Sequence, residues 1–177
     1  MILKLKQNPG IYLVGFMGCG KSKVGGALAD ELGWSFYDLD EEIEQAAGTS
    51  IEELFDQQGE AAFRTLETET LKKRVYNVRT GRPQVIALGG GTFTIQENFE
   101  LASNHGVTIW LDTPLEVIER RIASETHRPL ARDPVRLQTL YADRRDAYTR
   151  ADYRIETEDQ DPANIVARIL ALPLFRP

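Results

Sequence analysis

Short apolar segments of strand length alternate along the chain with longer segments of helical periodicity. Ile11–Val14, Trp34–Tyr37 and Pro83–Leu88 are largely apolar runs, each followed directly by glycine or aspartate. Gly106–Leu111 is a fourth such run, and Asp152–Ile155 is the candidate for a fifth. Since strands that alternate with helices form βαβ units, the pattern predicts an α/β protein with a parallel sheet covered by helices on both faces.

Helical periodicity fills the segments between the candidate strands. Val24, Leu28 and Leu32 recur at four-residue steps. This spacing predicts a helix over residues 21–32 that ends at Gly33. No linker or repeat divides the chain, so we expect one domain. Further helices are predicted near residues 40–47, 50–58, 60–78 and 162–172.

The residues with the most distinctive chemistry come directly after candidate strands. Gly15–Ser22, Asp38–Asp40, Gly89–Gly91 and Asp112 each follow one. In open α/β sheets, ligands bind beyond the carboxyl ends of the strands. We therefore expect these four segments to meet at one edge of the sheet.

The segment Gly15–Ser22, with the sequence G-F-M-G-C-G-K-S, matches the phosphate-binding pattern G-x-x-x-x-G-K-[S/T]. Backbone N–H groups in such a loop surround a polyphosphate. Lys21 would reach the β- and γ-phosphates, and the Ser22 hydroxyl would bind Mg²⁺. Cys19 is either a small side chain that fits the loop or a thiol activated by the helix N-terminus, and we favour the first interpretation.

Asp38 and Asp40 lie two residues apart at a strand end, where an extended backbone would point them to the same side. One carboxylate would then hold the Mg²⁺ shell, and the other would accept a proton from an attacking hydroxyl. The alternative is an acidic turn that caps the next helix. The expected position across the sheet edge from Lys21 favours the functional interpretation.

Glycines and arginines supply the remaining candidates. Gly89–Gly91 costs backbone entropy, and three glycines favour close approach of a ligand over a simple turn. Arg64, Arg128 and either Arg144 or Arg145 are candidate anion clamps, because guanidinium groups bind carboxylate or phosphate with two hydrogen bonds. The alternative interpretation is that each is a solvated surface arginine, and composition alone favours this alternative.

Charge and composition narrow the classes of partner. Lys and Arg number 21 against 27 Asp and Glu, a net charge of −6, which argues against a nucleic-acid surface. A single cysteine excludes an intramolecular disulfide and favours a reducing compartment. Met1–Lys6 is too short and lysine-rich for a signal peptide, and no apolar run approaches the ~18 residues of a membrane span. We expect a cytoplasmic protein that binds neither membrane nor nucleic acid.

Taken in order, these motifs resemble those of shikimate kinases, from about Ile11 to Leu172. The resemblance is carried by the phosphate loop, the D-x-D pair, Gly59–Glu67 (G-E-A-A-F-R-T-L-E), the triple glycine, Arg128-Pro129-Leu130, and Arg144 with Tyr148 four residues on. It implies a three-layer α/β/α P-loop fold with a five-stranded parallel sheet of nucleoside-monophosphate-kinase type. It further implies transfer of the ATP γ-phosphate to the 3-hydroxyl of shikimate, with Mg²⁺ as cofactor.

The resemblance also implies a role for individual residues. A lid segment, about residues 125–133, would close Arg128 onto the phosphates, and a helical segment, about 40–79, would bind substrate. The residues implied are, for catalysis, Lys21, Asp40 and Arg128; for ATP, Gly18, Cys19, Gly20, Lys21, Ser22, Lys23, Arg121 and Arg128; for shikimate, Asp40, Arg64, Gly89, Gly90, Gly91 and Arg144; and for Mg²⁺, Ser22 and Asp38.

Other functions of a phosphate-loop protein remain as alternatives. A kinase of another small hydroxy acid, such as gluconate, shares the loop and sheet, and the arginines around the acidic pair distinguish the two. A GTPase switch would carry an N-K-x-D guanine reader, which this sequence lacks. A non-catalytic relative that only binds nucleotide is opposed by the intact Lys21, Asp38 and Asp40. We expect the protein to act as a monomer.

Overall fold

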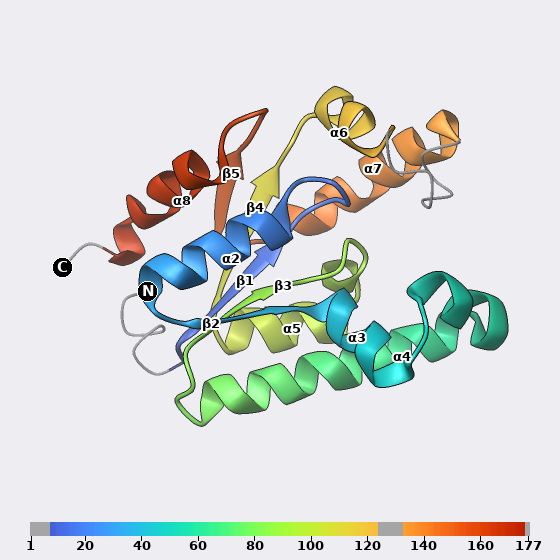
Figure 1. Ribbon diagram of the computed structural model, residues 1–177, viewed down its shortest axis with the longest axis horizontal. Coiled ribbons are helices and arrows are strands. Elements are labelled where there is room, and N and C mark those ends of the chain that lie inside the picture. The colour runs from blue at the N-terminus through green and yellow to red at the C-terminus, as the bar shows by residue number, and fades with distance from the viewer. Residues whose placement is uncertain (1–7, 124–132, 176–177) are drawn as a thin grey trace.

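A computed structural model describes residues 8–123 and 133–175 of the chain. Its centre is a five-stranded sheet in the order β2-β3-β1-β4-β5, and all four pairs of neighbouring strands are parallel (Figure 1). This arrangement confirms the predicted α/β fold and its five strands. The strands are β1 (Gly10–Val14), β2 (Ser35–Asp38), β3 (Gln84–Ala87), β4 (Val107–Asp112) and β5 (Tyr153–Glu156).

The three inner strands, β1, β3 and β4, are buried on both faces, whereas the edge strands β2 and β5 are partly exposed. Successive side chains of a strand point to opposite sides of the sheet. In β1, Ile11 and Leu13 pack into one apolar cluster, and Tyr12 and Val14 into the other. The first cluster is covered by α2 (Lys21–Leu32) and α8 (Pro162–Leu170). The second is covered by helices that include α4 (Ile51–Arg79), α5 (Gln96–Asn104) and α7 (Pro134–Tyr148).

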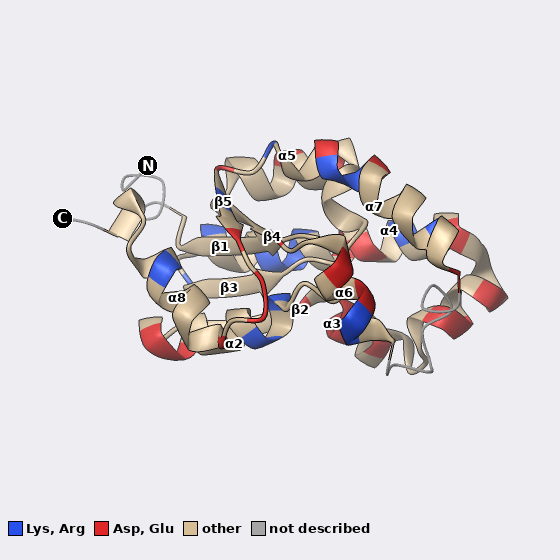
Figure 2. Cartoon of the chain, turned by 90° about the horizontal axis from the view of Figure 1, so that it is seen from above, with Lys and Arg blue, Asp and Glu red and all other residues tan. Residues whose placement is uncertain are grey.

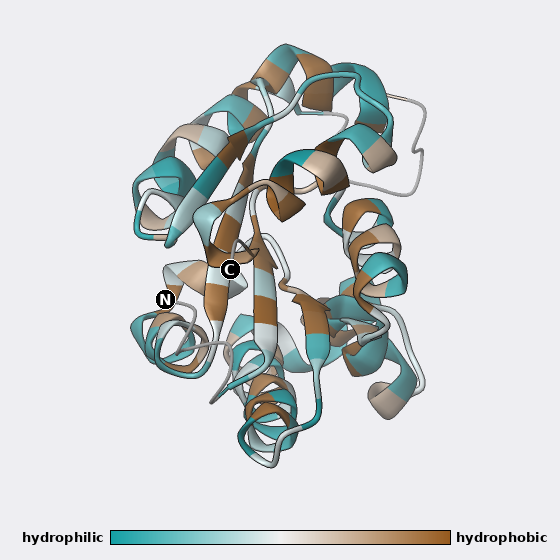
Figure 3. Ribbon diagram, turned by 90° about the vertical axis from the view of Figure 1, so that its left-hand side faces the viewer, coloured by the Kyte–Doolittle hydropathy of each residue, from teal (hydrophilic) through white to brown (hydrophobic). Residues whose placement is uncertain are grey.

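The figures show the same layered arrangement. In Figure 1, α2 and α8 lie on one side of the sheet, with α4 and α5 on the other. The strands in Figure 3 carry brown and pale bands with some teal, and the helices carry both brown and teal residues. Charged residues in Figure 2 lie mostly on helices and loops. Within the described residues, no helix combines the length and apolar character needed to span a membrane.

Several predicted elements agree closely with the structure. Helix α2 has the predicted bounds and ends at Gly33, whose φ of 66° lies in the left-handed region. The two helices predicted near 50–58 and 60–78 form the single element α4, which is interrupted at Gly59 by φ 82° and ψ 170°. Ser50 caps α4 by accepting a hydrogen bond from the Glu53 N–H at 3.2 Å.

Two features differ from the sequence-based expectation. The hydrophobic pattern does not predict α5 or α7. Asp40 lies in the first turn of α3 (Leu39–Ala47) rather than in an extended strand end, so the predicted geometric reason for pairing it with Asp38 is wrong. Helix α6 (Leu115–Ile122) follows β4 and begins after Pro114.

Candidate active site

The phosphate loop connects β1 to α2, and three of its glycines have positive φ. These are Gly15 (146°), Gly18 (74°) and Gly20 (95°), and Gly20 precedes the first turn of α2. A methyl group on Gly15 would lie 2.7 Å from the Leu111 carbonyl oxygen, so the loop needs glycine there for space as well as conformation. The result is a glycine-rich loop that ends at a helix N-terminus without a side-chain cap, which suits a polyphosphate.

Lys21 lies across this loop. Its Nζ donates hydrogen bonds to the carbonyl oxygens of Gly15 at 2.7 Å and Phe16 at 3.0 Å. Cys19 is buried, with 1% of its surface exposed, which agrees with a small side chain that fits the loop. Lys23 is exposed in the first turn of α2. The hydrogen bonds of Lys21 thus hold its ammonium group against the phosphate loop.

Asp38 caps the next helix, which is one of the two roles that the sequence left open, and it also faces the phosphate loop. It is the last residue of β2 and the N-cap of α3, and its Oδ1 accepts hydrogen bonds from the N–H groups of Asp40 at 3.0 Å and Glu41 at 3.4 Å. Its other oxygen, Oδ2, accepts a hydrogen bond from the Ser22 hydroxyl. Capping therefore fixes the carboxylate so that it faces the phosphate loop.

The Ser22 and Asp38 oxygens fit a nucleotide-bound Mg²⁺. Within the described residues, no three His, Cys, Asp or Glu side chains gather as a metal site. Mg²⁺ in nucleotide sites takes only one or two protein oxygens and completes its shell with phosphates and water. The hydroxyl and carboxylate that meet beside Lys21 are ligands of the required kind.

Asp40 lies against the glycine turn after β3. A methyl group on Gly89 would lie 2.6 Å from Asp40 Oδ1 and 3.2 Å from Glu67 Oε2. Burial, together with the negative charge of Asp38, raises the pKa of the Asp40 carboxyl to about 6, while the Lys21 charge opposes this rise. Asp40 is therefore a carboxyl group that changes its protonation state close to physiological pH.

Two arginines reach the same turn. A methyl group on Gly91 would lie 2.6 Å from Arg64 Nη2, and one on Gly90 would lie 3.1 Å from Arg144 Nη1. Burial and the positive charge of Arg64 lower the pKa of Arg144. An anion bound between the two guanidinium groups would relieve this repulsion.

A buried carboxylate holds Arg64 in place. Glu67, with 1% of its surface exposed, accepts a hydrogen bond from Arg64 Nη1 at 2.8 Å and another from the Thr92 hydroxyl at 2.6 Å. Sequence reasoning assigned no role to either Glu67 or Thr92. The three-residue step from Arg64 to Glu67 on one helix is the signal that was available.

The structure also separates Arg144 from its neighbour. Arg145 forms two hydrogen bonds with Asp112, from Nη1 to Oδ1 at 2.6 Å and from Nη2 to Oδ2 at 3.0 Å. Asp112 lies at the carboxyl edge of the sheet as expected, but its carboxylate is occupied by arginines. Of the two candidate clamps, only Arg144 lies against the glycine turn.

Comparison with known proteins identifies the family. The family model described as shikimate kinase matches residues 17–172. The chain belongs to the shikimate kinase family. A shikimate kinase of Persephonella marina is 41% identical over 90% of this chain and 96% of that relative.

Solved structures of the shikimate kinase family superpose on this one. Shikimate kinase from Acinetobacter baumannii in complex with shikimate has a TM-score of 0.86 at 36% identity, over 96% of this chain and 95% of that chain. The enzyme from Aquifex aeolicus has a TM-score of 0.80 at 37% identity, over 91% and 94%. A gluconokinase from Sinorhizobium meliloti, with a TM-score of 0.56 at 19% identity over 93% and 91%, shares the fold alone.

Arg121 of α6 contacts the phosphate loop. Its Nη1 donates to the Gly18 carbonyl oxygen at 3.0 Å, and its Nη2 to the Glu158 carbonyl oxygen at 2.6 Å. The loop between β5 and α8 is thereby tied to the phosphate loop, a contact that sequence reasoning did not anticipate. Arg128 and most of the predicted lid, residues 125–132, lie outside the described residues.

Proposed function

We propose that this protein transfers the γ-phosphate of ATP to the 3-hydroxyl of shikimate and so forms shikimate 3-phosphate. One observation carries the proposal: Asp40, Arg64 and Arg144 all lie against the glycine turn, and the Lys21 charge acts on Asp40 from the phosphate loop. Shikimate is a small ring with one carboxylate and several hydroxyls. Such a molecule calls for guanidinium groups at one end and a carboxylate at the other.

The phosphate loop would supply the donor half of the reaction. Lys21 would exchange its bonds to the Gly15 and Phe16 carbonyls for the β- and γ-phosphates of ATP. Ser22 and Asp38 would hold Mg²⁺, which neutralises charge on the phosphate oxygens when it is bound. Because phosphoryl transfer needs little covalent chemistry from the protein, positioning and charge supply most of the catalysis.

Asp40 would serve the acceptor. The 3-hydroxyl oxygen attacks the γ-phosphorus, the bond from that phosphorus to the bridging oxygen breaks and leaves ADP, and the hydroxyl proton passes to the Asp40 carboxylate. A pKa of about 6 leaves Asp40 mostly ionised at pH 7 to 8 yet close enough to accept a proton. Its position against Gly89 supports this role, because the glycine turn is where the substrate would bind.

Arg64 and Arg144 would grip the carboxylate of shikimate, with backbone N–H groups of the Gly89–Gly91 turn as further donors. Glu67 would hold Arg64 in the gripping orientation. Arg121 would lie near the adenine, and Arg128 would act as the lid arginine. We propose the same cytoplasmic, monomeric setting, without nucleic acid or membrane, that the sequence favours.

A coupled ADP-release assay tests the proposal most directly. The acceptors would be shikimate, gluconate, nucleoside monophosphates and none, each with Mg²⁺ and ATP. We expect ADP release above the no-acceptor rate with shikimate alone. Comparable kcat/KM with gluconate would favour the other hydroxy-acid kinase, and no release with any acceptor would favour a non-catalytic nucleotide binder.

A further inference from the structure

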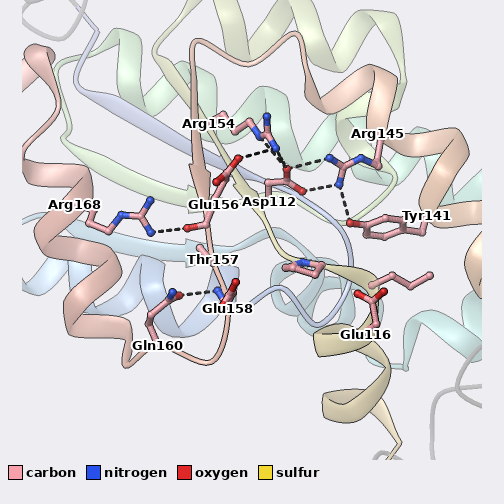
Figure 4. Close-up of a pocket in the computed structure, with 12 residues that line it drawn as sticks. Asp112, Glu116, Tyr141, Arg145, Arg154, Glu156, Thr157, Glu158, Gln160 and Arg168 are labelled. Atoms are coloured by element: carbon pink, nitrogen blue, oxygen red, sulfur yellow. Dashed lines mark hydrogen bonds and ion pairs between the residues drawn. The ribbon is translucent and has the colours of Figure 1, made fainter.

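A network of side chains ties α7 to the end of β4 (Figure 4). Arg145 of α7 grips both oxygens of Asp112, the last residue of β4, and its Nη1 also lies 2.7 Å from the Tyr141 hydroxyl oxygen. Asp112 has 6% of its surface exposed, and β4 lies inside the sheet, between β1 and β5. The partner of Arg145 is therefore a rigid point of the fold.

The network extends to the phosphate loop through Tyr141. Its hydroxyl donates to the Thr113 carbonyl oxygen at 2.9 Å, and its ring meets the Phe16 ring edge-on, with centroids 5.4 Å apart and an interplanar angle of 80°. The guanidinium carbon of Arg144 lies 5.7 Å from the centroid of the same Phe16 ring. Two residues of α7, Tyr141 and Arg144, therefore contact Phe16 of the phosphate loop.

The rotation of α7 about its axis decides where Arg144 points. Consecutive helical residues are about 100° apart around the axis, since a turn takes about 3.6 residues. With Arg145 held on Asp112, its neighbour Arg144 projects toward Gly90. If Arg145 were released, α7 would keep its contacts through Leu137, Tyr141 and Tyr148, and it would lose its hold on Asp112 near the C-terminal end of the helix.

We propose that Arg145 is a positioning residue for Arg144: its paired hydrogen bonds to Asp112 orient α7 so that Arg144 meets the substrate carboxylate. This inference rests on the proposed function. Arg145 itself does not contact the turn, so it acts on substrate affinity only through Arg144. Loss of Arg145 should therefore weaken binding of the acid substrate and leave ATP binding nearly unchanged.

Arg154 offers a matched control. It binds the same Asp112 carboxylate, with Nε and Nη2 at 2.8 and 2.7 Å from Oδ2, and it also pairs with Glu156 at 3.0 Å. It extends from β5 rather than from α7, as Figure 4 shows. Replacing it removes an arginine from the same acid without releasing the helix that carries Arg144.

The experiment compares Arg145→Met, Arg154→Met, Arg144→Ala and the double variant Arg144→Ala with Arg145→Met. We expect Arg145→Met to raise the KM for shikimate about tenfold and that for ATP less than about twofold. Arg154→Met should change neither constant by more than about twofold. In the Arg144→Ala background, adding Arg145→Met should raise the KM for shikimate less than about twofold further, because the two act as a unit.

Three results would overturn the inference: equal effects of Arg145→Met and Arg154→Met, equal loss of affinity for ATP and shikimate, or independent effects in the double variant. Asp112→Asn provides a second route if Arg145→Met does not fold, and it should reproduce the rise in the KM for shikimate. The kinetics of the wild-type protein separate a failure of the proposed function from a failure of the positioning role. Absence of shikimate-dependent ADP release contradicts the proposed function, whereas normal wild-type kinetics with any of the three results contradicts the positioning role alone.

Discussion

Asp40, the proposed base, shows at the residue scale how a buried carboxylate acts against stability. An aspartate in water has a pKa near 3.8, and burial beside Asp38 raises this value to about 6 in the folded protein. Between these two values the folded chain binds more protons than the unfolded chain, so stability falls as the pH rises from about 4 to about 6. Above pH 6 the ionised, partly buried carboxylate imposes its full cost.

Asp40→Asn should therefore separate activity from stability. We expect turnover to fall by orders of magnitude, because the amide cannot accept the hydroxyl proton. At pH 8 the variant should be more stable than the wild type by up to about 3 kcal/mol, since each pKa unit is worth about 1.4 kcal/mol. Urea unfolding at pH 8 and pH 4 measures the difference, which should nearly vanish at pH 4. A variant with near-normal turnover would exclude Asp40 as the base.

The pH dependence of catalysis should carry the same signature. We expect kcat/KM for shikimate to fall as the pH drops below about 6, where Asp40 becomes protonated. The negative charge of Glu67 contributes to the raised pKa of Asp40. Glu67→Gln should therefore move this acidic limb to lower pH. The variant should also lower kcat/KM at every pH if the weaker hold on Arg64 reduces substrate affinity. A limb that stays in place in the variant would show that Asp40 does not set it.

At the scale of single elements, α2 couples the phosphate loop to the sheet through close packing. Gly25 lies where a methyl group would be 2.4 Å from Phe36 Cε2 and 3.3 Å from Leu13 Cδ1. Gly26, one residue on, would place its methyl group no closer than 4.0 Å to the same ring. Helix α2 can therefore pack this closely against Phe36 of β2 only because residue 25 has no side chain.

The two glycines form a matched pair of variants. Gly26→Ala should stabilise the protein by up to about 1 kcal/mol, because alanine favours a helix over glycine. Gly25→Ala should lose this gain and destabilise by about 1–3 kcal/mol, because the added methyl group overpacks against Phe36. Denaturant unfolding of both variants provides the measurement. Equal stabilisation by both would mean that the Phe36 ring moves aside at no cost.

At the scale of the whole molecule, an acidic protein concentrates positive charge in one place. The net charge is −6, yet Lys21, Arg64 and Arg144 converge at the carboxyl edge of the sheet. The edge joins segments that follow β1, β2 and β3 with side chains from α4 and α7, so the two anionic substrates would meet where these elements converge. Such a site forms only when the whole sheet is assembled.

Nucleotide binding should accordingly stabilise the whole domain. At 100 times its Kd, MgATP should add about 2.7 kcal/mol and raise Tm by about 5–10 °C. Lys21→Met should remove most of this shift, because the phosphates lose their principal cation. Thermal unfolding with ATP, with and without excess EDTA, tests the contribution of the metal. A full shift in Lys21→Met would contradict the assignment of that lysine.

The elements that local sequence could predict are those whose periodicity is strong. The inner strands and α2 have strong apolar patterns that end at glycine or aspartate, and they appear where predicted. Helix α7 buries only Leu137 and Tyr148, and it is otherwise held by arginine and tyrosine contacts. Its sequence therefore has little apolar periodicity to recognise. Helix α5 is short, and its buried residues are the polar Asn98 and the small Ala102, which are weak signals of a helix face.

The sequence by itself determined the kind of chemistry: a phosphate cradle, an acidic pair and a glycine turn, because each is a local pattern placed directly after a strand. The tertiary structure alone decided which contacts these groups make. It placed Arg144 on the glycine turn and Arg145 on Asp112, and it put Glu67 behind Arg64. Neighbouring residues on a helix face different directions, and only packing against the sheet sets the rotation of that helix.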